Sequence, residues 1–214
     1  MVQVLVMALA SRFGSLPWMA ESFFAPLSVR FERWLSQLEE AGGRFIWEDA
    51  DNALLLRTGL ALVVGMERGA RQRSRRLAER LLVLDDQDSL GLRELVLDQL
   101  LREERNAEAV ALSNQHEPSG DGPLLGVLMG RALAQYRLEC FDEAEDSLAA
   151  VHKLNRHAIA MMCAENPRPV PLALEVPEPG SKAEAWQYRA LMRDQWVATP
   201  GALKWLAEQR WHFA

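Results

Sequence analysis

The stretch ECFDEA at residues 139–144 decides the fold of this chain. It follows a run rich in Leu and Ala, and its closing Glu-Ala pair recurs 35 residues earlier, at 108–109, again after a Leu-rich run. A further 35 residues back stands Ser74, another small residue on an apolar stripe. Recurrence at a period of roughly 20–50 residues is typical of helical repeats. We therefore predict stacked helix pairs with the small residues Ser74, Ala109 and Ala144 at equivalent positions.

The rest of the chain also has helical character. Leu, Ala, Glu and Arg are abundant, and all four favour helices. Apolar residues at helical spacing predict helices over residues 27–41, 50–67, 70–84, 90–104, 124–138, 142–154 and 155–162, with a shorter one after Asn106. Ser181 is a suitable cap for a helix to about Trp196. Thr199-Pro200 predicts a final helix with proline at its first position.

The expected helices fall into three regions. Residues 1–49 form an N-terminal helical segment, and residues 50–165 contain the repeats. Residues 166–180 include five prolines and predict an extended connector, so residues 166–214 are a connector with C-terminal helices packed on the repeats. Residues 1–10 are apolar apart from Gln3, but no basic residue precedes them as in a signal peptide. We expect them to pack on the body as a helix or strand.

The last pair of predicted helices resembles a tetratricopeptide repeat, a unit of about 34 residues with two antiparallel helices. Ala109 and Ala144 match the small position of its second helix. The stretch at 139–144 resembles the consensus turn, with Glu139 where glycine is usual, and Ala132 and Tyr136 match positions in the first helix.

The resemblance covers roughly residues 53–156 and is good only in the last unit. Leu128 and Arg93 stand where the consensus has tryptophan. The resemblance implies an all-α fold, with antiparallel helix pairs stacked as a short right-handed solenoid and non-repeat helices at both ends. The turn at 85–93 and the stretch ATPGALKWL at 198–206 also resemble a group of bacterial proteins with degenerate repeats, which implies no particular chemistry.

Such a fold implies a protein-interaction scaffold rather than an enzyme. Stacked helix pairs form a concave groove lined by the first helix of each pair. Outward residues of the helices at 90–104 and 124–138 are therefore the candidates for binding a peptide or protein: Arg93, Asp98, Arg131 and Gln135.

An Arg-rich helix offers an alternative. Residues 68–80 contain six arginines, whose planar groups suit phosphate and carboxylate, and the candidates for binding an anion or nucleic acid are Arg68, Arg71, Arg75 and Arg76. A solvated helix whose arginines pair with nearby acids explains the same pattern. The net charge of −6 argues against nucleic acid, which needs basic contacts.

Other chemistry-bearing residues form no recognisable site. His152 and His157 stand five residues apart, not the four of a helical zinc pair. We expect no metal, cofactor or membrane segment. The two cysteines predict reduced, buried thiols and a cytoplasmic protein. Seven tryptophans are expected mostly in the core.

Overall fold

The computed structural model describes residues 18, 20–115, 123–170 and 177–209. These residues form ten α-helices and one π-helical turn, with no strand, as predicted for an all-α chain. None of the described helices is both long and apolar enough to cross a membrane. The expected packing of residues 1–10 and the position of Trp211 lie outside the described residues.

The helices occur close to the predicted places in the sequence. In chain order they are η1 (Ala20–Phe24), α3 (Ala25–Glu40), α4 (Ala50–Met66), α5 (Arg71–Leu84), α6 (Leu92–Arg102), α7 (Asn106–Asn114), α8 (Leu125–Arg137), α9 (Phe141–Leu154), α10 (Ala158–Cys163), α11 (Lys182–Ala198) and α12 (Ala202–Gln209).

The chain divides into two compact units, unit 1 (residues 1–99) and unit 2 (residues 100–214). The sequence predicted three regions instead. The boundary falls within α6, and the C-terminal helices belong to the same unit as α8 and α9 because α11 packs on α8 and α10.

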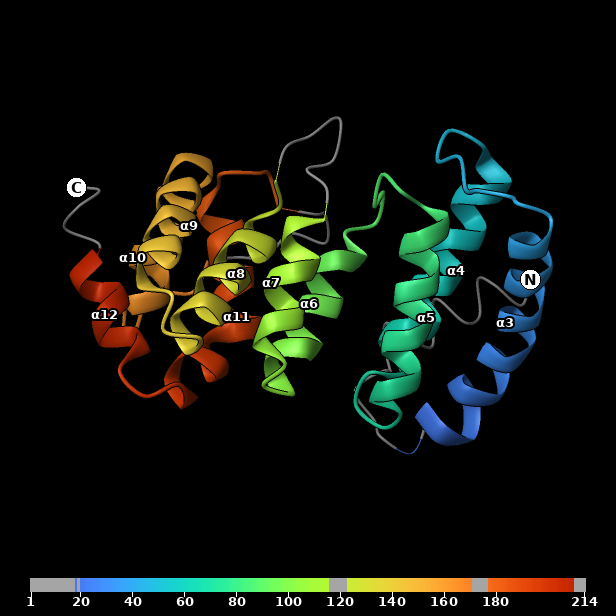
Figure 1. Cartoon of the computed structure of the whole chain (residues 1–214), viewed down its shortest axis with the longest axis horizontal. Helices are drawn as coiled ribbons and strands as arrows, with labels where there is room; N and C mark the ends of the chain where they lie inside the picture. Colours follow the sequence, from blue (N-terminus) through green and yellow to red (C-terminus); the bar gives the residue numbers. More distant parts are fainter. Residues whose placement is uncertain (1–17, 19, 116–122, 171–176, 210–214) are drawn as a thin grey trace. The chain divides into compact units, whose positions relative to one another are not determined.

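In unit 1, helices α3, α4 and α5 pack against one another, and η1 contacts α3 and α4 (Figure 1). Arg73 and Arg80 of α5 pair with Glu32 and Glu39 of α3. The two arginines are seven residues apart, and so are the two glutamates, in the same order along the chain. Helices α3 and α5 therefore run in the same direction.

The α4–α5 crossing is close, as the small residue Ser74 predicted. Its side chain is fully buried, and its hydroxyl donates to the Val63 carbonyl of α4 at 2.7 Å. A Cβ placed on Gly59 of α4 would lie 2.7 Å from Leu81 of α5. Both residues therefore allow the two helix backbones to approach.

Unit 2 is built around α8, which packs between α7 and α9 and also contacts α11 (Figure 1). Ala109 of α7 and Ala144 of α9 are fully buried, as predicted for the small position of each second helix. Helix α10 packs on α9, α11 and α12. Helices α11 and α12 thus pack on α8 and α10.

The turns before α7 and α9 have matching backbones. Glu104 and Glu139, 35 residues apart, have φ of 58° and 62° in the left-handed region that favours glycine. Their amides donate to the carbonyls three residues earlier at 3.2 and 3.0 Å. The next residues, Arg105 and Cys140, each donate to the carbonyl five residues earlier. Glu139 therefore adopts the conformation for which the consensus turn uses glycine.

Helix α12 does not begin as predicted. The Thr199 hydroxyl donates back to the Gln195 carbonyl of α11 at 2.8 Å instead of capping a new helix. Pro200 and Gly201 form a turn, with Gly201 at a φ of 77°, and α12 starts at Ala202. The Thr-Pro pattern therefore does not cap α12, because the Thr199 hydroxyl is hydrogen-bonded at the end of α11.

The tryptophan and cysteine expectations also need correction. Among the described tryptophans only Trp196 is fully buried, and Trp18 is 65% exposed. Cys140 and Cys163 are not joined in a disulfide, and they are half-buried rather than buried. Cys140 lies at the exposed start of α9, and Cys163 ends α10.

Candidate interaction surfaces

Arg93 does not point outward as expected for a groove residue. It lies in the first turn of α6 and is only 6% exposed, with its Nε 4.0 Å from Asp88 Oδ2. Asp88 also accepts hydrogen bonds from the amides of Leu92 and Arg93, so it caps the start of α6. Asp98, further along the same helix, is half-buried.

Burial makes the Asp88 carboxyl a weaker acid than an ordinary aspartate. The carboxyl has lost its water, and this desolvation outweighs the Arg93 charge and the two amide hydrogen bonds, raising its pKa to about 6. Asp85, at the C-cap of α5, also has its pKa raised by burial, although hydrogen bonds from Ser89 oppose the shift. The turn between α5 and α6 therefore holds two buried acids.

Arg131 and Gln135 of α8 meet at one hydroxyl. Arg131 Nε donates to Ser147 Oγ of α9 at 3.0 Å, and that hydroxyl donates to Gln135 Oε1 at 2.6 Å. Arg131 also reaches Asn114 of α7 at 3.5 Å. Both side chains are half-buried and link α8 to its neighbours, so only part of each is available to a partner.

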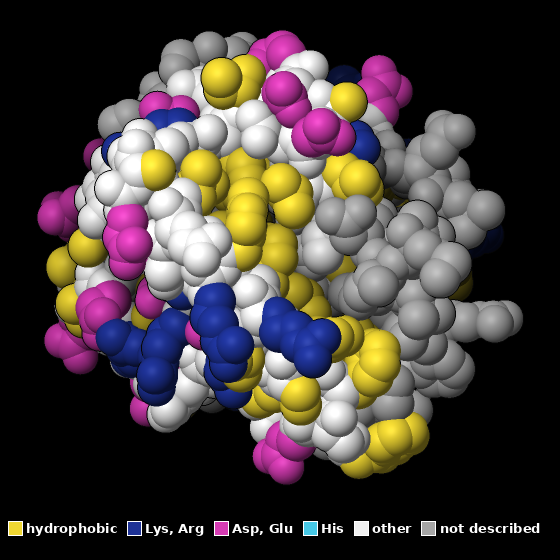
Figure 2. Space-filling model, turned by 90° about the vertical axis from the view of Figure 1, so that its right-hand side faces the viewer, with side chains coloured by type: hydrophobic (Ala, Val, Ile, Leu, Met, Phe, Trp, Pro, Cys, Tyr) yellow, Lys and Arg dark blue, Asp and Glu magenta, His cyan; other side chains and the backbone are white. Residues whose placement is uncertain are grey.

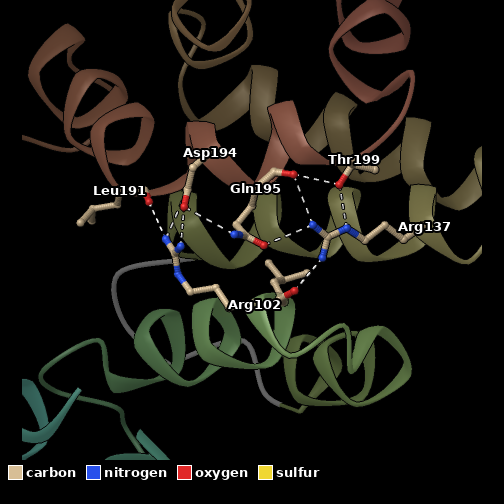
Figure 3. Close-up of polar contacts among 7 residues, drawn as sticks. Arg102, Arg137, Leu191, Asp194, Gln195 and Thr199 are labelled. Atoms are coloured by element: carbon tan, nitrogen blue, oxygen red, sulfur yellow. Dashed lines mark hydrogen bonds and ion pairs between the residues drawn. The ribbon is translucent and has the colours of Figure 1, made fainter. Parts of the chain in front are cut away.

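Two arginines that the groove prediction did not include reach across to α11. Arg102, at the end of α6, donates to the Leu191 carbonyl at 2.8 Å and pairs with Asp194 at 2.5 Å. Arg137, at the end of α8, donates to the Gln195 carbonyl at 3.3 Å (Figure 3). They are 35 residues apart, so the repeat period could have identified them as equivalent.

Arg137 is the more deeply embedded of the two. It also donates to Thr199 Oγ1 at 2.9 Å and to the Leu101 carbonyl at 2.7 Å (Figure 3). Burial lowers its pKa below the ordinary arginine value. For Asp194, burial opposes ionisation, but the hydrogen bonds and charge of Arg102 hold its pKa below the usual range. The pair therefore binds α11 through backbone carbonyls and one carboxylate.

A second set of contacts fixes the start and middle of α11. Asn155, after α9, donates to the Ser181 carbonyl at 2.9 Å and to Glu184 at 2.8 Å. Ser181 caps α11 as predicted, accepting from the Glu184 amide. The buried Arg189 donates to the Met161 and Met162 carbonyls at the end of α10, a favourable place for a cation.

The Arg-rich helix α5 carries arginines of two kinds. Arg73, Arg75 and Arg80 pair with Glu32, Glu79 and Glu39. The Arg80 hydrogen bonds hold the pKa of Glu39 below its usual value. These pairings match the interpretation of α5 as a solvated helix tied to its neighbours.

The remaining arginines of this stretch, Arg68, Arg71 and Arg76, are exposed. No acidic side chain of the described residues lies within ion-pair distance of them. Figure 2 faces the α3 side of unit 1 and shows basic side chains in a row beside a run of hydrophobic ones. Unpaired basic groups are thus present in unit 1, although Arg75 is not among them.

Neither a metal cluster nor a known relative assigns a function. Within the described ranges, no group of three or more His, Cys, Asp or Glu side chains could hold a metal ion. No family model matches the chain, and no match to it is found among curated proteins or solved structures.

Proposed function

We propose that this chain is a non-catalytic protein-interaction scaffold made of tetratricopeptide-like helix pairs stacked as a short solenoid. Its partner is a peptide or protein segment bound on the helical surface of unit 2. We place it in the cytoplasm, where its two free cysteines would stay reduced.

One observation carries the proposal. Arg102 and Arg137, at equivalent positions of successive helix pairs, both bind the same helix, α11. Their targets include two backbone carbonyls and the Asp194 carboxylate, groups that many helices present. Capture of a helix by side chains repeated along a helical array is how such scaffolds bind partners, and α11 is an example within the chain.

The packing of α11 within unit 2 also limits where a partner binds. Because α11 already contacts α8 and both arginines, a partner binds to side chains that remain accessible. In unit 2 the proposal keeps Arg131 and Gln135, which are half exposed. Arg93 is withdrawn as a groove residue because it is buried against Asp88.

The test is affinity capture from native cell extract with the tagged full chain. We expect a discrete protein whose binding to the purified chain saturates. Arg131→Glu with Gln135→Lys should weaken that binding about tenfold or more, whereas the exposed control Arg156→Glu should leave it unchanged. Thermal unfolding of each variant separates lost binding from lost folding. Saturable binding that is insensitive to the double substitution would remove the groove residues from the proposal, and no saturable partner would remove the scaffold.

A second candidate is binding of nucleic acid or another polyanion, favoured by the exposed Arg68, Arg71 and Arg76, which pair with no acid of the described residues. It predicts a mobility shift with labelled DNA or RNA at low salt that weakens steeply as salt is added. The triple change of these arginines to Glu should abolish the shift. A control with the same charge change replaces Arg156, Arg168 and Lys182, all exposed in unit 2. No shift at low salt, or equal losses in both triple variants, would contradict this candidate.

A further inference from the structure

Three aromatic rings form a continuous row on unit 2. Tyr136 of α8 lies between Trp205 of α12, with ring centroids 4.9 Å apart, and Phe141 of α9, at 5.5 Å. The rings thus come from three helices that are separate in the sequence. Tyr136 and Trp205 are half-buried, while Phe141 is 45% exposed. Each of the three residues therefore keeps part of its surface in contact with solvent.

The central ring is held in place. The Tyr136 hydroxyl donates to the Pro200 carbonyl at 3.1 Å. A Cβ on Gly201 would come within 2.8 Å of the same hydroxyl oxygen, so only glycine fits there without movement. Gly201 also has a φ of 77°, which side chains rarely adopt. The turn before α12 is therefore shaped around Tyr136, and the row is preformed.

Acidic side chains border the row on the α9 side. Glu139, Asp142 and Glu143 are all exposed. Within the described residues, no basic side chain lies within ion-pair distance of them. Lys204 of α12 instead faces Glu208, at 4.0 Å. The exposed Leu138 completes the patch. The surface therefore combines aromatic rings with carboxylates that no basic side chain of the described residues neutralises.

We propose that this aromatic-acidic patch binds an arginine-bearing segment of a protein partner. A guanidinium group stacks on Trp and Tyr faces and pairs with carboxylates, and both groups are offered here side by side. An acidic segment would be repelled, and a purely apolar one would leave the carboxylates unused. The inference rests on the proposed scaffold function and names one partner chemistry for it.

The test is an NMR titration of the full chain with capped peptides of alternating glycine and arginine, glycine and lysine, or glycine and glutamate. The Trp205 indole signal is assigned with Trp205→Phe. We expect the arginine peptide to shift this signal and the amides of Glu139 and Asp142. The lysine peptide should bind several-fold more weakly because it stacks less well, and the glutamate peptide should cause no shift.

Matched variants distinguish binding at the patch from attraction by the overall negative charge of the chain. Glu139→Gln with Asp142→Asn, and separately Phe141→Ser, should weaken arginine-peptide binding about tenfold. Glu165→Gln with Glu178→Gln removes the same charge from exposed sites elsewhere and should leave binding unchanged. Equal losses in both double variants, equal binding of the arginine and lysine peptides, or no shift at Trp205 would each overturn the proposal. The scaffold itself is tested separately, by saturable capture of a native partner.

Discussion

Arg137 lies 35 residues after Arg102, and the guanidinium groups of both donate to carbonyls of α11 four residues apart, Leu191 and Gln195. The two arginines, 35 residues apart in the sequence, thus contact successive turns of α11. The proposed scaffold function rests on this relationship.

The two arginines should differ in their effect on stability. Arg137→Met removes hydrogen bonds to two part-buried carbonyls and to the Thr199 hydroxyl, and it should lower the free energy of unfolding by roughly 2 kcal/mol or more. Arg102→Met removes an ion pair whose Asp194 partner is 59% exposed, so it should cost less than about 1 kcal/mol. Urea unfolding followed by circular dichroism measures both. Equal costs would show that burial of Arg137 has been overestimated.

The small repeat positions should resist enlargement. Ala109→Leu and Ala144→Leu insert bulk into fully buried helix crossings and should each destabilise the chain by about 1–3 kcal/mol. The control Ala190→Leu, on the exposed side of α11, should change stability by no more than about 0.5 kcal/mol. The same unfolding assay applies. Tolerance of Leu at both buried sites would contradict close crossing there.

Glycine should be favourable at the two left-handed turn residues. Glu104→Gly and Glu139→Gly relieve φ values near 60° and should stabilise unit 2 by up to about 1 kcal/mol each. Glu143→Gly, only four residues further but inside α9, should destabilise by about 1 kcal/mol. Thermal unfolding should therefore move in opposite directions for the two kinds of site. A loss of stability at both turn positions would refute the matching turn geometry.

Asp88 should give stability a distinctive pH dependence. Its folded-state pKa, about 6, is above the ordinary 3.8, so the folded chain holds this proton more tightly than the unfolded chain. The resulting stability is fully present below about pH 4 and is lost as pH rises through 6. Asp88→Asn removes this term. Between pH 4 and pH 7.5, the free energy of unfolding of the variant should rise by up to about 3 kcal/mol relative to that of the unmodified chain.

The neighbouring Asp86→Asn is the control for this measurement. Asp86 is exposed and takes no part in capping α6, so Asp86→Asn should change stability between the two pH values by much less than Asp88→Asn does. Urea unfolding at both pH values measures the two changes. Equal changes in the two variants would contradict the role given to Asp88.

The helices and the small crossing positions could be predicted because they depend on local patterns. Leu and Ala at helical spacing indicate each helix, and burial at Ala109 and Ala144 follows from a period visible in the sequence. The start of α12 could not be predicted in this way. Thr199 is a good cap by type, but its hydroxyl is taken by the Gln195 carbonyl of the helix before it.

The candidate surfaces were harder to predict because side-chain direction depends on tertiary neighbours. Arg93 was expected to face outward, yet the carboxylate of Asp88 and the turn before α6 hold it in the interior. The 35-residue spacing relates Arg102 to Arg137, but their shared contact with α11 depends on tertiary structure. The aromatic row likewise joins α8, α9 and α12, which no sequence window contains.

The central claim, that unit 2 binds a protein partner, is tested most directly by photo-crosslinking in the native cell. A photoreactive phenylalanine analogue is placed at Gln135 or Phe141, and at the exposed control positions Lys153 and Glu178. The account predicts a discrete protein adduct at Gln135, at Phe141 or at both, and none at the controls. Adducts at the controls alone, or no protein adduct at any position, would contradict it.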